Sequence, residues 1–352
     1  MLFKLIDHSK TSFYKNKNMI KKNFYVIKLQ LLLIIYSFFL MYHKYNINEN
    51  FKDFDINKNK INLDYENHSF AILRRTNCRY CGLFSYFIVY LGCINKYVSL
   101  GYIPIIDLKS FPNIFNKMNA SLLNSNPWEL FFYQPFRYTL ENIEKKVKKL
   151  KYFRCFGNEI RPNDDIFFND ILIDFWHKIA KFYIPIKNEV LTEAKNIFKK
   201  LFKNSKNILG IFVRGTDYIS RKPKNHPIPP KPETVIKDIK ELDKKYIYDW
   251  FFIATEDDII REKFIKEFRN KLKYLKMNNQ NFNCKYNYKS KQFFADNKKI
   301  LGNLQFIKIY LLNVIIVSKC IDIISARTSG SIGIFIIKNK FRNSKVYNLG
   351  IY

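Results

Sequence analysis

Short apolar runs recur along the chain from residue 68 onward, and each run ends in polar or small residues. Apolar runs of this length, bounded by turn signals and alternating with helical patterns, are typical of buried parallel strands joined by helices. The runs lie at residues 70–73, 102–107, 208–213, 250–254 and 320–324. We therefore predict an α/β fold with parallel sheets.

Helical spacing of apolar residues separates the predicted strands. The run Leu83–Ser99 is followed by a glycine that can close a helix, so the first unit is βαβ. Pro185 is expected to divide the stretch 169–203 into two helices, because proline breaks a helix interior. A chain of 352 residues is long enough for two domains. We place them at 68–200 and 201–352.

The N-terminal region has a different pattern. Residues 1–23 form a basic tail, residues 24–42 are almost entirely apolar, and residues 43–67 have the composition of a linker. The apolar stretch is near the lower length limit for crossing a bilayer. We favour a single membrane anchor, since no small-residue site for signal cleavage follows. A true start at Met41 would instead leave a soluble cytoplasmic protein.

The charge of the chain is strongly positive. Lys and Arg number 61 against 30 Asp and Glu, which gives a formal net charge of +31. The excess is spread along the sequence without a nucleic-acid motif or a basic arm, so nucleic acid is excluded as a partner. An anionic membrane or a phosphorylated substrate remains. The densest cluster, residues 145–151, is predicted to be a solvated helix face.

Six scattered cysteines do not predict a disulfide framework in a chain of this length. Cys78 and Cys81 form the only close pair, and no second pair completes a four-ligand zinc site. Local packing is the favoured interpretation of this pair. The cysteine usage mildly favours a cytosol-like compartment.

Candidate chemistry gathers where the strands of the second half end. In open α/β sheets the ligand crevice lies at the carboxyl ends of the strands. An arginine fork suits a phosphate, and a helix start offers free N–H groups to an anion. Each junction, where a strand ends and the next helix begins, also has a structural explanation, either a surface ion pair or helix capping. Three junctions together predict a nucleotide crevice. Their polar residues are Arg214, Thr216 and Asp217, then Thr255, Glu256 and Asp257, then Thr328, Ser329 and Ser331.

Two further segments are candidates for ligand contact. The proline-rich loop 220–232 carries His226, which could serve as a base or a phosphate donor, or could be an ordinary exposed histidine. The aromatic segment 126–135 could line a sugar site, although core packing is the favoured interpretation.

The ordered junctions resemble a known family. Val213–Tyr218 resembles the first motif of the α-1,2- and α-1,6-fucosyltransferases and the related protein O-fucosyltransferases, in which a strand ends in His-x-Arg-Arg-x-Asp. Phe252–Asp258 is similar to their second motif, and Ile324–Ser331 to their third. Gly82–Asp107 resembles their N-terminal glycine loop, helix and strand. The order and rough spacing agree across residues 68–340.

The resemblance implies a GT-B fold, with two Rossmann-like domains and GDP-fucose bound by the C-terminal one. It also implies inversion without a metal or another cofactor. Carried over by position, Arg214 would contact the donor β-phosphate and offset the charge on the departing GDP. Thr216 and Asp217 would shape that loop. Arg214 and Asp217 are the candidate catalytic residues.

The other two motifs imply the remaining donor contacts. Thr255, Glu256 and Asp257 would lie near the nucleoside, and Thr328, Ser329 and Ser331 would lie near the phosphates.

This chain departs from the family pattern at two positions. The family's histidine is Phe212 here, and its second arginine is Gly215. The only D-x-D triplet, at 53–55, falls in the predicted linker, which argues against the metal-dependent glycosyltransferase fold. Inversion needs a base for the acceptor hydroxyl. The candidates are, in declining order, Asp217, Glu233 and His226.

Two functions from different classes follow. The first is an inverting glycosyltransferase that uses GDP-fucose or a similar nucleotide sugar on a surface-glycan acceptor, an oligosaccharide or glycolipid, with the membrane as a further partner. The second is a non-catalytic basic membrane-associated protein that binds anionic glycan or lipid.

Overall fold

The computed structural model describes residues 65, 68–76, 78, 81–113, 115, 125–203, 205–215, 218, 219, 222, 224–275 and 304–352. The predicted tail, anchor and linker, including the D-x-D triplet, lie outside these residues apart from Tyr65. Among the helices that are described, none combines the length and the apolar character needed to span a bilayer.

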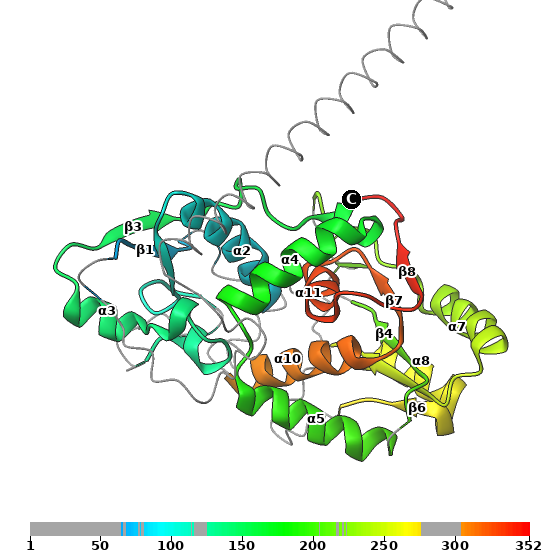
Figure 1. Ribbon diagram of the computed structural model, residues 1–352. Helices are drawn as coiled ribbons and strands as arrows, with labels where there is room; N and C mark the ends of the chain where they lie inside the picture. The colour runs from blue at the N-terminus through cyan, green and yellow to red at the C-terminus, as the bar shows by residue number, and fades with distance from the viewer. Residues whose placement is uncertain are drawn as a thin grey trace, which may run out of the picture.

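The N-terminal domain is built on a three-stranded parallel sheet (Figure 1). Its strands, in the order β2-β1-β3, are β1 (Phe70–Arg74), β2 (Ile103–Asp107) and β3 (Lys151–Arg154). Helix α2 (Leu83–Ser99) connects β1 to β2, as the βαβ pattern predicted. Most of α2 is buried, because it packs beside its own sheet and against the C-terminal domain. The shorter elements are α3 (Leu140–Lys146), η2 (Pro127–Leu130), η3 (Pro135–Arg137) and η4 (Asp164–Phe168).

The C-terminal domain is built on a five-stranded parallel sheet in the order β6-β5-β4-β7-β8. Its strands are β4 (Ile208–Phe212), β5 (Trp250–Ala254), β6 (Leu272–Lys273), β7 (Asp322–Ala326) and β8 (Ser344–Tyr347). Its helices are α7 (Pro232–Tyr246), α8 (Asp258–Phe268), η5 (Arg269–Lys271), α10 (Leu304–Lys319) and α11 (Ser329–Lys338). The strand order reverses between β4 and β7, and ligands of doubly wound sheets bind at such a switch point. The predicted α/β fold with two Rossmann-like domains and parallel sheets is confirmed.

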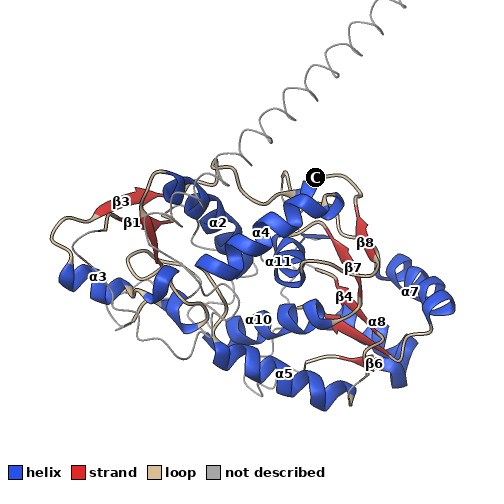
Figure 2. Cartoon of the chain, viewed as in Figure 1, coloured by secondary structure: helices blue, strands red, loops and turns tan. Residues whose placement is uncertain are grey.

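Two helices connect the domains, α4 (Asp170–Tyr183) and α5 (Asn188–Phe202), with Pro185 between them as predicted. Helix α4 packs against α11 and α2, and α5 packs against α10 (Figure 2). The domain boundary at residue 200 stays a prediction. One hydrophobic core runs through both domains and includes the facing sides of α2 and α11.

The two domains approach closely at Gly333 of α11. A Cβ built at this glycine would overlap the ring of Phe84, which stands in the first turn of α2. The missing side chain therefore lets the first turn of α2 lie directly on α11.

Three sequence predictions need correction. Strands β3 and β8 were not expected, because both are short, charged and largely exposed. The basic cluster 145–151 is not one helix face, since α3 ends at Lys146 and Lys151 begins β3.

The prediction that the cysteines form no disulfide framework was also wrong. Cys78 pairs with Cys81 and Cys93 pairs with Cys155, with Cα–Cα distances of 5.3 Å and 6.4 Å that a disulfide can bridge. The second pair is separated by 62 residues, so only the fold brings it together.

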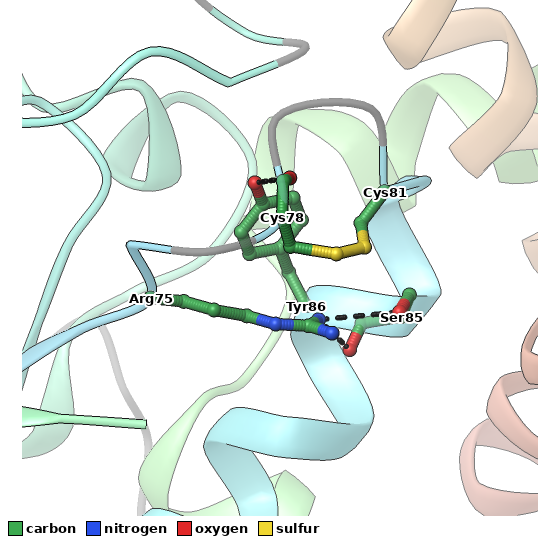
Figure 3. The surroundings of a disulfide bond; sticks show 5 residues. All are labelled: Arg75, Cys78, Cys81, Ser85 and Tyr86. Atoms are coloured by element: carbon green, nitrogen blue, oxygen red, sulfur yellow. Dashed lines mark hydrogen bonds between the residues drawn. A yellow bond between two sulfur atoms is a disulfide. The ribbon is translucent and has the colours of Figure 1, made fainter. Parts of the chain in front are cut away.

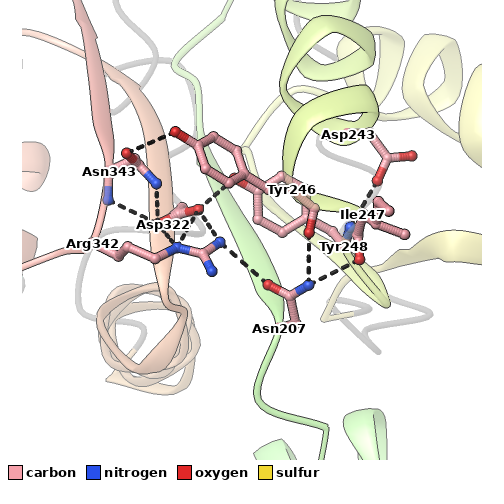
Figure 4. Close-up of polar contacts among 8 residues, drawn as sticks. All are labelled: Asn207, Asp243, Tyr246, Ile247, Tyr248, Asp322, Arg342 and Asn343. Carbon is pink, nitrogen blue, oxygen red and sulfur yellow. Dashed lines mark hydrogen bonds and ion pairs between the residues drawn. The ribbon is translucent and has the colours of Figure 1, made fainter.

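A network of hydrogen bonds joins the amino ends of strands in the C-terminal domain, at the edge of the sheet opposite the predicted crevice (Figure 4). Asp322, 1% exposed at the start of β7, accepts hydrogen bonds from Tyr248, Asn343 and Arg342, with the Arg342 Nη2 at 2.6 Å. Burial acts to raise the pKa of Asp322, but the hydrogen bonds from Arg342, Tyr248 and Asn343 outweigh it and hold the pKa below its usual value.

Replacing Asp322 by Asn should lower the free energy of unfolding by about 1–3 kcal/mol at pH 7, because hydrogen bonds to a charged buried acceptor are lost. A carboxyl with a lowered pKa in the folded state stabilises above the unfolded pKa, near 3.9, and loses that contribution as the pH falls through the folded value. Urea unfolding should therefore show that the difference in the free energy of unfolding between wild type and D322N becomes smaller from pH 7 to pH 3. The exposed Asp170→Asn should change stability by less than about 0.5 kcal/mol. A gap that stays constant with pH would contradict the charge-based account.

The contact between Gly333 and Phe84 gives a second prediction. Gly333→Ala should destabilise the protein by about 1–3 kcal/mol, because the added methyl overpacks the domain contact. In a Phe84→Ala background the same change should be neutral or stabilising by up to about 1 kcal/mol, since alanine then contributes its higher helix propensity. Thermal or urea unfolding of the four proteins in a double-mutant cycle measures the difference. An equal cost in both backgrounds would show that the Phe84 ring is not the obstacle.

Candidate active site in the inter-domain cleft

A cleft of about 1000 Å³ opens between the two domains, at the carboxyl ends of β4 and β7. The first turn of α2 and the segment 161–165 line it on the N-terminal side. The end of β4, the start of α11, the loop at 225–227 and the segment 348–351 line it on the other side. The cleft therefore lies at the switch point of the larger sheet.

Arg214 comes from the central strand of that sheet. All five residues of β4 are buried, and the strand ends at Phe212, so the chain reaches the cleft two residues later. The Arg214 guanidinium lies 4.6 Å from the centre of the Tyr218 ring, within the range of a cation–π contact. This position agrees with the predicted delivery of a cation to the edge of the sheet.

The start of α11 faces the cleft beside Arg214. Thr328 is the N-cap of α11, and its hydroxyl accepts a hydrogen bond from the Ser331 N–H at 3.2 Å. Thr328 and Ser329 line the cleft. The fully buried Ser331 hydroxyl donates to the Ala326 carbonyl, so it serves the cap. Gly330 keeps the helix close to β4, because a Cβ there would lie 2.6 Å from the Phe212 ring.

The three candidate residues after β5 do not all face a pocket. Thr255 and Glu256 line a smaller pocket that adjoins the cleft and shares Arg214 and Thr328 with it. Asp257 is the N-cap of α8 and accepts hydrogen bonds from the N–H groups of Ile259 and Ile260. The nucleoside contacts expected of these three residues stay predictions.

The candidates for a base lie in different places. His226 lines the cleft, with Nδ1 3.1 Å from the Lys224 carbonyl. Glu233 stands in the first turn of α7, paired with Lys263 at 2.6 Å, and does not line the cleft. Thr216 and Asp217 lie outside the described residues, so their roles also stay predictions.

Five charged residues of the cleft were not singled out as ligands by the sequence. They are Arg75, Arg161, Asp164, Asp165 and Arg327. Arg327 belongs to the third motif, but nothing in the motif marks it as a ligand. Arg75 directly follows β1, so the strand-end rule could have marked it. The signal for the other three is the polar turn Arg161-Pro-Asn-Asp-Asp165, in which the Asn163 side chain caps η4.

Asp164 faces Arg327 across the domain boundary, with its Oδ2 3.6 Å from the arginine Nη1. Burial raises the pKa of Asp164, and the charge of Asp165 adds to this, while Arg327 acts in the opposite direction. Its carboxyl is thus more basic than an ordinary aspartate, and it lines the cleft. Among the residues described, no group of three or more His, Cys, Asp or Glu side chains is arranged to hold a metal ion.

The fold and the cleft define a two-domain α/β protein with parallel sheets and a cleft between the domains. No protein-family model matches the sequence, and no curated protein matches it. Among solved structures, the chain is similar to NodZ α-1,6-fucosyltransferase soaked with GDP-fucose, at 12% identity and a TM-score of 0.43, over 77% of this chain and 92% of that one.

Two further solved structures are similar. NodZ from Bradyrhizobium matches at 14% identity and a TM-score of 0.44, over 73% of this chain and 88% of that one. POFUT1 in complex with GDP matches at 9% identity and a TM-score of 0.35, over 79% and 73%. The two NodZ structures are of a fucosyltransferase.

Proposed function

We propose that this protein is an inverting, metal-independent glycosyltransferase. It transfers a sugar from GDP-fucose, or from a similar nucleotide sugar, to a glycan acceptor. The observation that carries the proposal is the meeting of Arg214 with the start of α11 at the switch point between β4 and β7. A cation and a helix N-terminus at this place suit a diphosphate.

The diphosphate is the leaving group, and the cleft is suited to receive its charge. Arg214 can bind two phosphate oxygens through its planar fork. The N–H groups at the start of α11 and the hydroxyls of Thr328 and Ser329 supply further donors. Arg327 adds a second cation on the same domain. Donors fixed in place before the reaction stabilise charge that develops in the transition state.

The acceptor hydroxyl attacks the anomeric carbon as the bond from that carbon to the phosphate oxygen breaks. A base must take the hydroxyl proton. We assign this role to Asp164, because it lines the cleft from the acceptor-side domain and its pKa is raised by burial. Glu233 is less suited, since it stands outside the cleft and is paired with Lys263.

Removal of Arg214 tests the donor site. Arg214→Ala should weaken GDP binding by about 10- to 100-fold, the equivalent of losing charged hydrogen bonds worth about 1.5–3 kcal/mol. Isothermal titration calorimetry measures this directly. The matched control is Arg154→Ala, an exposed arginine on β3 outside the cleft, which should leave GDP binding unchanged. If the wild type binds no GDP, the proposal fails and the non-catalytic alternative is favoured.

The pH dependence of turnover tests the base. Asp164 must be deprotonated to accept a proton, so activity should fall as the pH drops through its pKa. Because that pKa is raised, the acid limb of kcat/KM should lie above 3.9, the ordinary aspartate value. Asp164→Asn should remove this limb and lower kcat by about 10²- to 10⁴-fold without weakening GDP binding, because it leaves Arg327 unpaired beside the diphosphate.

Release of GDP from the sugar donor, followed across pH, provides the measurement for that test. Asp170→Asn is the control, because this exposed aspartate lies outside the cleft and should have only a small effect. An acid limb that persists in D164N would contradict this assignment and favour another base, with His226 as a candidate that also lines the cleft.

A further inference from the structure

Two arginines, Arg75 and Arg161, line the cleft on the N-terminal side. The donor site proposed above uses the C-terminal side, where Arg214 and the start of α11 lie. The two N-terminal arginines are therefore available for a different part of the bound substrates.

Arg75 is held in place before any ligand binds. Its Nη1 donates hydrogen bonds to the Ser85 carbonyl at 2.7 Å and to the Ser85 hydroxyl at 3.2 Å (Figure 3). The guanidinium also lies 5.1 Å from the centre of the Tyr86 ring, whose hydroxyl donates to the Cys78 carbonyl. The disulfide between Cys78 and Cys81 lies near this group.

Arg161 is positioned through the same helix. The disulfide from Cys93 in α2 to Cys155 fixes the start of the segment that leads to Arg161. Gly92 then allows that segment to lie against α2, because a Cβ built there would be 2.8 Å from the Arg161 Cβ and 2.9 Å from the Ile160 carbonyl. Both arginines are thus placed by α2.

No carboxylate forms an ion pair with Arg75 or Arg161 within the described part of the chain. Glu159, the nearest acidic residue along the chain, accepts a hydrogen bond from the Gly157 N–H, and Asp164 is directed to Arg327. Burial lowers the pKa of Arg75 and the positive charge of Arg161 contributes to the lowering, while Tyr86, Tyr90 and Glu159 act in the opposite direction. Two cations that line one cleft repel each other, and a bound anion would relieve that repulsion.

We propose that Arg75 and Arg161 form an anion subsite that binds a carboxylate, sulfate or phosphate group on the glycan acceptor. The acceptor class is then an acidic glycan. This inference rests on the proposed function, because it assigns the N-terminal side of the cleft to the acceptor.

Calorimetry with defined oligosaccharides at saturating GDP tests the subsite. The probes are neutral chitotetraose, a uronate-containing hyaluronan tetrasaccharide and a sulfated N-acetylglucosamine disaccharide. At least one acidic probe should bind tenfold more tightly than the neutral one. The acidic probe that binds more tightly shows which anionic group, carboxylate or sulfate, the subsite prefers. Arg161→Gln should reduce that advantage to about twofold or less without changing GDP binding. Arg161 is exposed, so this substitution should not affect folding.

The control for general attraction to a basic protein is Arg154→Gln, which removes the same charge from the same domain outside the cleft. Arg154→Gln should leave the tighter binding of the acidic probe over the neutral probe unchanged. The subsite is overturned if neutral and acidic probes bind equally, or if both arginine variants lose the advantage alike. A loss of GDP affinity in Arg161→Gln would assign the residue to the donor instead. Wild-type protein that binds the acidic probe but not GDP would refute the proposed function while the subsite stands.

Discussion

The close approach of Phe84 to Gly333 is the contact on which the rest of the cleft depends. It sets the first turn of α2 on α11, with the Phe84 ring against the backbone of Gly333. The Phe84 ring also contacts Tyr310 of α10, which in turn contacts Phe212 at the end of β4. A continuous aromatic path therefore joins the N-terminal domain to the central strand of the larger sheet. Close-packed interiors transmit such constraints because they have little free volume.

The same contact brings together groups that would otherwise lie on separate domains. Ser85, which holds Arg75, follows Phe84 directly, while Thr328 and Ser329 lie one turn before Gly333. The cation Arg75, proposed for the acceptor, and the start of α11, proposed for the donor, are therefore positioned by one packing arrangement. The polar network around Asp322 fixes the opposite ends of β7 and β8, so the strands that reach the cleft are held at both ends.

The sequence predicts the buried part of this structure well, because burial leaves a pattern. Strands β4 and β5 are continuous apolar runs, and their bounds were predicted within one residue. Edge strands such as β8 carry lysine and serine, so no apolar run marks them. Arg161 was missed for a similar reason, because a glycine contact between distant segments places it and leaves no periodic signal. Arg75 directly follows β1, so the strand-end rule that marked Arg214 could have marked it as well.

The two departures from the fucosyltransferase pattern have a physical explanation in the packing. A side chain at position 215 would collide with Asp257, whose carboxylate caps α8 and whose Cβ would lie 2.6 Å away. Phe212 is buried against Gly330, so a polar group there would be placed in the aromatic path instead of the cleft. The space for the family's two extra polar groups is thus filled by structural contacts. If the diphosphate binds here, the charge that Arg214 cannot supply alone has to come from Arg327 and the start of α11.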